Sequence, residues 1–181
     1  CVSLATQNIA RGQVLEVSEP PLTATPKHWR SVTRDKIAGL FGAGAQSAAY
    51  WGNSSEETAS TLFEFGLHVG MAAQLKTELK AIEDKKLFQK ILKKQDLWSP
   101  LCFLLHECMP AEECQEMSDK LLKEFDVQEM FTELGILFKK YEVQAKVHAE
   151  AEVELREAKE CFERLELDSA PLQPLTQYSM I

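Results

Sequence analysis

Apolar residues recur at helical spacing along almost the whole chain, and this periodicity restricts the possible folds more than any other feature. No stretch sustains the alternation of apolar and polar residues that marks a half-buried strand. The sequence therefore predicts an all-α protein. Its 181 residues are enough for one domain with a real core, and we expect a single helical domain over residues 1–167.

Capping and breaking residues divide the first half of this pattern. We expect a helix over residues 2–17 and a loop over 18–31, because three prolines there disfavour a helix. A second helix, capped by Ser31 or Thr33, is expected over 34–51. Ser55, which two glutamates follow, predicts the start of a third helix that reaches about residue 83.

The second half predicts shorter helices and then a longer one. A basic amphipathic segment comes first, followed by an apolar helix that opens at Pro100 and another that starts at Pro110. Helical periodicity then covers 127–167, with a break expected near Gly135. The tail, 168–181, carries two prolines and is expected to be extended or disordered.

Composition excludes some classes of partner. The net charge of −8 argues against a nucleic-acid backbone or an anionic membrane surface as the main partner. No apolar run approaches the roughly 20 residues of a membrane span, so no transmembrane segment is expected. The five cysteines are odd in number and loosely spaced, which predicts reduced thiols in the cytoplasm or another reducing compartment.

Familiar catalytic and metal motifs give little. The four histidines are scattered, and neither a nucleophile motif nor a phosphate-binding loop of the P-loop or dinucleotide type is present. His106 lies close to Cys102 and Cys108, but the spacing matches no usual zinc pair, so we expect these residues to pack in an apolar core.

One expected helix changes character along its length. The segment 63–82 begins apolar, with Gly66 and Gly70 one turn apart, and becomes polar from Gln74 onward. The polar end is either solvated or lines a polar cavity.

Three fragments, in order, carry the most information. They are "IARGQVLEV" (9–17), "RDKIAGLFGAGAQSAAYWG" (34–52) and "FEFGLHVGMAAQLKTELK" (63–80). Each fragment alone is compatible with simple helix packing, since glycine and alanine usually mean that two helices approach closely.

Together these fragments resemble the trans-isoprenyl diphosphate synthases, the polyprenyl synthetase family. That family has a Gly-Gln followed by an acidic residue, then a Lys-Thr-Ala-x-Leu-Phe-type stretch, then a helix reading roughly F-G-x-x-L-G-x-A-F-Q-I-x-D-D-x-x-D. The matching residues here are Gly12, Gln13 and Glu16; Lys36 to Phe41; and Phe65, Gly66, Gly70, Ala72, Gln74 and Leu75. The resemblance covers about residues 4–82 well and the rest loosely.

The resemblance implies an isoprenoid synthase-type helical barrel with a deep central cavity, of which this chain is the later part. It also implies a reaction in which an allylic diphosphate ionises and isopentenyl diphosphate or another prenyl acceptor attacks the carbocation. Mg²⁺, held by two aspartate-rich motifs, neutralises the leaving diphosphate in such enzymes. A homodimer, or a heteromer with another synthase chain, is expected on the same basis.

Site residues follow from the same resemblance. Lys36, Gln74 and Gln13 are expected to act in the reaction, and Phe41 and Phe65 are expected to contact substrate together with Lys36 and Gln74. Local alternatives remain open, because Lys36 suits a solvated position at a helix start and Gln74 suits a buried hydrogen bond between helices. A basic stretch that includes Lys85, Lys86, Lys90, Lys93 and Lys94 could bind diphosphate or form a solvated face.

The second aspartate motif is degenerate. Its positions fall at Thr77, Glu78 and Ala81, so Glu78 is the one remaining candidate ligand for Mg²⁺. No Asp-Asp-x-x-Asp sequence occurs in the chain, and by resemblance the first aspartate motif belongs upstream of Cys1. Because the chain opens inside a helical pattern, we expect it to be part of a longer protein or to lack an N-terminal part.

Three hypotheses follow. The first is a prenyltransferase whose first aspartate motif lies upstream. The second is a non-catalytic regulatory or structural subunit of a heteromeric prenyl diphosphate synthase. The third sets the resemblance aside and treats the chain as a helical interaction module.

Overall fold

The computed structural model describes residues 2–18, 24–94, 98–123 and 125–165, and every regular element in these ranges is a helix. The predicted all-α class is therefore confirmed. The elements follow in the order α1 (Val2–Ser18), α2 (Pro26–Thr33), the π-helix η1 (Arg34–Ala38), α3 (Gly39–Trp51), α4 (Glu56–Leu79), the 3₁₀ turn η2 (Lys80–Ile82), α5 (Lys85–Lys94), α6 (Ser99–Phe103), the π-helix η3 (Leu104–Cys108), α7 (Ala111–Leu121), α8 (Val127–Lys140) and α9 (Val143–Arg164).

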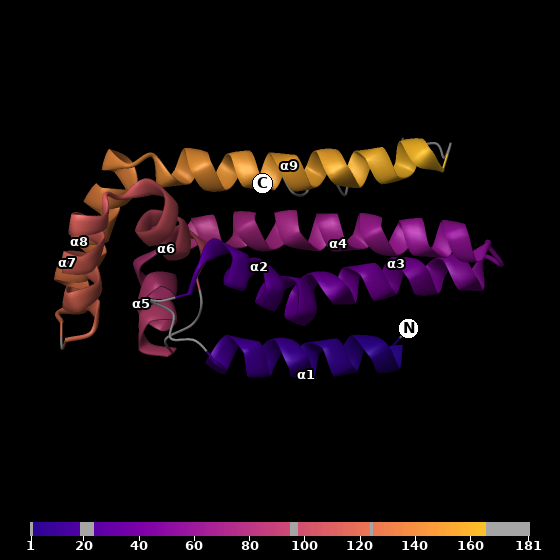
Figure 1. Cartoon of the computed structure of the whole chain (residues 1–181), viewed down its shortest axis with the longest axis horizontal. Helices are drawn as coiled ribbons and strands as arrows, with labels where there is room; N and C mark the ends of the chain where they lie inside the picture. Colours follow the sequence, from indigo (N-terminus) through magenta and orange to yellow (C-terminus); the bar gives the residue numbers. More distant parts are fainter. Residues whose placement is uncertain (1, 19–23, 95–97, 124, 166–181) are drawn as a thin grey trace.

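The long helix α4 forms the centre of the array. Figure 1 shows α9 along one side of α4 and α3 along the other, with α1 beyond α3, while α5 to α8 gather at one end. The start of α4 follows from its sequence, because the Ser55 hydroxyl accepts a hydrogen bond from the amide of Thr58, as the N-cap prediction requires.

Close packing between α3 and α4 depends on glycine. A Cβ atom built on Gly66 of α4 would lie 2.5 Å from the carbonyl oxygen of Phe41 and 2.7 Å from Cα of Gly42, both in α3. Only a hydrogen fits in that space, so the small residues of these fragments bring two helix backbones together.

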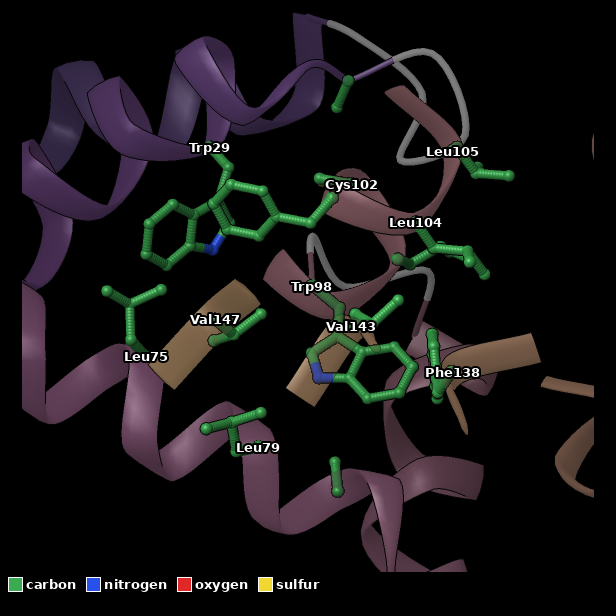
Figure 2. Packing of buried hydrophobic residues seen from close by; sticks show 14 of the residues in the cluster. Trp29, Leu75, Leu79, Trp98, Cys102, Leu104, Leu105, Phe138, Val143 and Val147 are labelled. Carbon is green, nitrogen blue, oxygen red and sulfur yellow. The ribbon is translucent and has the colours of Figure 1, made fainter. Parts of the chain in front are cut away.

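The apolar core lies where α2, α4, α6, α8 and α9 meet. Its most deeply buried large side chains include Trp29 and Trp98, each 1% exposed. Figure 2 shows Trp29 near Leu75 of α4, while the Trp98 ring packs edge-to-face against Phe138 with 5.3 Å between ring centroids. This core surrounds the polar end of α4.

Three predicted boundaries were wrong. The loop expected over 18–31 ends early, because Thr25 caps α2 and Pro26 occupies its first turn, a position where proline is compatible with a helix. Neither Ser31 nor Thr33 caps a helix, since α2, η1 and α3 run on without interruption to Trp51. The break expected near Gly135 lies instead at Glu142, whose backbone adopts the left-handed conformation with φ of 51°.

Some expectations remain predictions. The tail 168–181 lies outside the described residues, and the single-domain assignment of 1–167 is untested. Within the described ranges, no helix is both long and apolar enough to cross a membrane. The predicted reducing compartment, cytoplasmic or other, also remains a prediction.

Candidate functional site

The end of α1 and the π-helix η1 bring the first group of predicted site residues together. The ammonium of Lys36 donates a hydrogen bond to Oε2 of Glu16, and the amide of Gln13 donates to the same oxygen at 2.9 Å. The side chains of Lys36 and Glu16 are 24% and 21% exposed. We call Gln13, Glu16 and Lys36 the lysine cluster.

A glycine allows α1 and η1 to approach this closely. A Cβ atom on Gly12 would lie 2.7 Å from Cγ of Lys36 and 2.8 Å from Cβ of Asp35. One residue earlier, the Arg11 guanidinium binds the Asp35 carboxylate through two hydrogen bonds of 2.7 and 2.6 Å. The Gly-Gln fragment therefore brings η1 close to α1, and Arg11 and Lys36 are each paired with a carboxylate.

The second group lies at the polar end of α4. Oε1 of Glu78 accepts hydrogen bonds from Nε2 of Gln74 at 2.7 Å and from the indole of Trp29 at 3.2 Å, and Oε2 accepts one from the amide of Ser99 at 2.7 Å. The indole of Trp98 donates to the main-chain oxygen of Glu78 at 3.0 Å. We call this group the Glu78 junction.

Glu78 is buried at 8% exposure. Burial raises the pKa of its carboxyl, and hydrogen bonds from Ser99, Gln74 and Trp29 oppose that shift. The Cys102 thiol lies in the same core, where burial and then the charge of Glu78 raise its pKa. In α4, Glu78 is the one acidic residue of the motif, and it is buried inside the protein. Its neighbour Thr77 is exposed to solvent.

The side chains at the degenerate motif do not fit a Mg²⁺ site. The Thr77 hydroxyl donates to the carbonyl of Ala73 in its own helix, Ala81 offers no side-chain ligand, and both oxygens of Glu78 already accept hydrogen bonds. Among the residues that the structure describes, no group of three or more His, Cys, Asp and Glu side chains could hold a metal ion. The side chains at this position therefore do not suit Mg²⁺ binding.

The two predicted aromatic contacts lie on different sides of α4. Phe65 is 7% exposed and packs edge-to-face on Phe162 of α9, with 4.3 Å between ring centroids. Phe41 lies on the α3 side and is 46% exposed. The structure therefore does not bring Phe65 to the lysine cluster, and the roles of both rings in substrate binding remain predictions.

An apolar surface accompanies Phe41. The sequence of α3, GLFGAGAQSAAYW, holds no charged residue, and its exposed positions other than Tyr50 fall on one side of the helix. Trp51 is 93% exposed, and among the described residues a Cβ atom on Gly44 would meet no atom from another part of the chain within 4 Å. We call this surface the α3 face; it comprises Leu40, Phe41, Gly44, Ala48 and Trp51.

Other sequence candidates have structural places. Cys102 is buried, as expected, whereas His106 is exposed. In the basic stretch, Lys85, Lys86 and Lys90 are exposed along α5, in agreement with a solvated face, and the side chains of Lys93 and Lys94 lie outside the described residues. Sequence reasoning missed Trp29, Trp98 and Ser99, which hold the Glu78 junction. The tryptophan content offered a signal, because a buried indole N–H needs an acceptor.

Comparison with known proteins identifies the fold. The polyprenyl synthase of Roseobacter denitrificans superposes with a TM-score of 0.82 at 21% identity, and the match covers 98% of this chain and 60% of that one. Octaprenyl pyrophosphate synthase of Helicobacter pylori gives a TM-score of 0.80 at 22% identity, covering 98% and 57%. The predicted isoprenoid synthase-type fold is confirmed.

A third structure contains ligands. Geranylgeranyl pyrophosphate synthase of Corynebacterium glutamicum, complexed with calcium and isoprenyl diphosphate, gives a TM-score of 0.81 at 20% identity, covering 99% of this chain and 56% of that one. The present chain thus spans less than two thirds of the length of these synthases.

The sequence itself places the chain in a family. None of the curated proteins compared with it matches. The sequence model of the family described as Polyprenyl synthetase matches residues 1–134, the greater part of the chain. The chain therefore belongs to the polyprenyl synthetase family.

Proposed function

We propose that this chain serves isoprenoid biosynthesis as a non-catalytic subunit of a heteromeric prenyl diphosphate synthase. The observation that carries the proposal is the ion pair of Lys36, the cation that is expected to hold the allylic diphosphate. Its ammonium is paired with Glu16, whose carboxylate would repel a diphosphate at the same place. A catalytic site needs the opposite arrangement, with cations directed toward the leaving group.

The α3 face supports the role of a subunit. It is an exposed apolar surface without a charged residue, which is typical of a surface that another protein layer covers. The partner proposed here is a second polyprenyl synthetase chain.

One experiment tests the proposal directly. The full chain is tagged and recovered from its native cells, and co-purifying proteins are identified by mass spectrometry. The proposal expects a second polyprenyl synthetase chain and expects Mg²⁺-dependent prenyl diphosphate synthesis only when both chains are present. An active homodimer of this chain alone would contradict it.

A second candidate is prenyl transfer from an allylic diphosphate by the chain itself, together with isopentenyl diphosphate or another acceptor. It is favoured by the lysine cluster, in which Gln13, Glu16 and Lys36, three residues of the family fragments, lie together. In that case the aspartate motif would come from outside the 181 residues. The hypothesis of an unrelated helical module has lost its premise, because the family is established.

A further inference from the structure

The Glu78 junction joins three separate parts of the chain through one residue. Trp29 belongs to α2, Gln74 to α4 itself, and Ser99 begins α6, so the side chain of Glu78 receives donors from three helices. Its main-chain oxygen receives a fourth donor, the indole of Trp98. Side chain and backbone of one residue therefore hold both buried tryptophans.

This arrangement has the properties of a structural carboxylate and lacks those of a metal ligand. A Mg²⁺ ligand must direct lone pairs toward an open position that several oxygens share. Glu78 is 8% exposed, each of its oxygens accepts a short hydrogen bond, and the other motif positions are Thr77 and Ala81. Three N–H donors supply the compensation that a buried carboxylate requires.

We propose that Glu78 is a metal-independent clamp that fastens α2 and α6 to the end of α4, at the position where a metal-binding carboxylate was expected. The acidic residue stands where the resemblance places a metal ligand, but its contacts are those of helix packing. This inference concerns folding and does not depend on whether the chain is catalytic.

The first test compares Glu78→Gln with Glu83→Gln in the full chain. Trp29 and Ser99 donate to different oxygens of Glu78, and an amide keeps only one of these as an acceptor. One of the two donors therefore faces the NH₂ group of the new side chain and loses its hydrogen bond. We expect the melting temperature of Glu78→Gln to fall by roughly 5–10 °C, with or without millimolar Mg²⁺. Glu83 is exposed, and its substitution should leave the melting temperature within about 2 °C.

The second test measures the junction by tryptophan fluorescence. In a Trp51→Phe background, the two remaining tryptophans are those held by Glu78, so their fluorescence reports on the junction. Adding MgCl₂ should change neither this emission nor the melting temperature. The milder Trp29→Phe variant, which removes one donor, should melt a few degrees lower.

Two results would overturn the proposal. One is a Mg²⁺-dependent rise in the melting temperature of the wild-type chain that Glu78→Gln abolishes, because it would identify a metal ligand. The other is a Glu78→Gln variant that melts together with the Glu83→Gln control. Neither readout involves turnover or a partner, so failure here is distinguishable from failure of the proposed function.

Discussion

Glu16 of α1 accepts a hydrogen bond from the ammonium of Lys36 in η1, and the same carboxylate oxygen accepts one from the side-chain amide of Gln13 at 2.9 Å. The residue that matches the acidic position of the family fragment therefore neutralises the cation expected to meet the substrate. We therefore expect the balance of charge in the lysine cluster to determine whether a diphosphate can bind there.

Removing the carboxylate should free that cation. In Glu16→Gln, Lys36 loses its charged partner, and we expect the affinity for inorganic pyrophosphate to rise about tenfold, since a charge-assisted hydrogen bond contributes about 1.5–3 kcal/mol. Isothermal titration calorimetry measures this change. Glu160→Gln, an exposed position on α9, alters the net charge equally and should have little effect; equal affinities for all three proteins would contradict the assignment.

Glycine is required at position 66 and dispensable at position 135. Gly66→Ala forces a methyl group against the backbone of Phe41, so we expect a loss of about 1–3 kcal/mol in the free energy of unfolding. Gly135 lies inside α8, and no other part of the described chain comes within 4 Å of a built Cβ, so Gly135→Ala should stabilise by about 0.5–1 kcal/mol. Chemical denaturation measures both, and a neutral Gly66→Ala would show that α3 and α4 can move apart.

The α3 face should be sensitive to charge only when the partner is present. Ala48→Glu places a carboxylate on an exposed position, so the isolated chain should melt normally while assembly with the second synthase chain falls at least tenfold. Ile136→Glu on α8, where the side chain is 63% exposed, is the matched control. Analytical ultracentrifugation of the mixed chains reports the assembly. Equal loss in both variants would remove the α3 face from the interface.

Lowering the pH should remove the contribution of Glu113 to the stability of the folded state. Its carboxylate accepts hydrogen bonds from the hydroxyl of Tyr141 at 2.6 Å and from Lys140 at 2.9 Å, and these lower its pKa below the ordinary 4.5. A lowered pKa means that the folded state favours the ionised form, so the stabilisation is present above pH 4.5 and is lost as the pH falls through the folded value.

The corresponding measurement compares thermal melts of wild type and Glu113→Gln across pH. The difference between them should be constant from neutral pH down to about 4.5 and should shrink below it. Glu112→Gln, next in the sequence and exposed, is the control. A difference that grows on acidification would reverse the predicted sign.

Local signals in the sequence predicted the helices well where a cap is encoded nearby. Ser55 followed by two glutamates was sufficient for the start of α4. Thr25 and Pro26 encode the start of α2 equally well, but the density of prolines around them suggested a loop. The turn between α8 and α9 was missed because Glu142 adopts a left-handed backbone conformation, which a glutamate in the sequence does not predict.

The candidate site was less predictable because its contacts span long stretches of sequence. The family fragments singled out Gln13, Glu16 and Lys36, which the structure brings together, but they did not predict that Glu16 pairs with Lys36. They could not show that Glu78 would be enclosed, because Trp29 lies 49 residues before it and Ser99 lies 21 residues after it. The order of the three family fragments predicts the fold. The chemistry of each candidate site residue depends on which distant side chains contact it.

The most direct measurement is Mg²⁺-dependent release of diphosphate from an allylic diphosphate by the full chain, with and without Lys36→Ala. The account predicts no release above background for the purified chain alone and no change on substitution, because the cation is already paired with Glu16. Robust release by the chain alone that Lys36→Ala abolishes would contradict the account and establish the chain as a prenyltransferase.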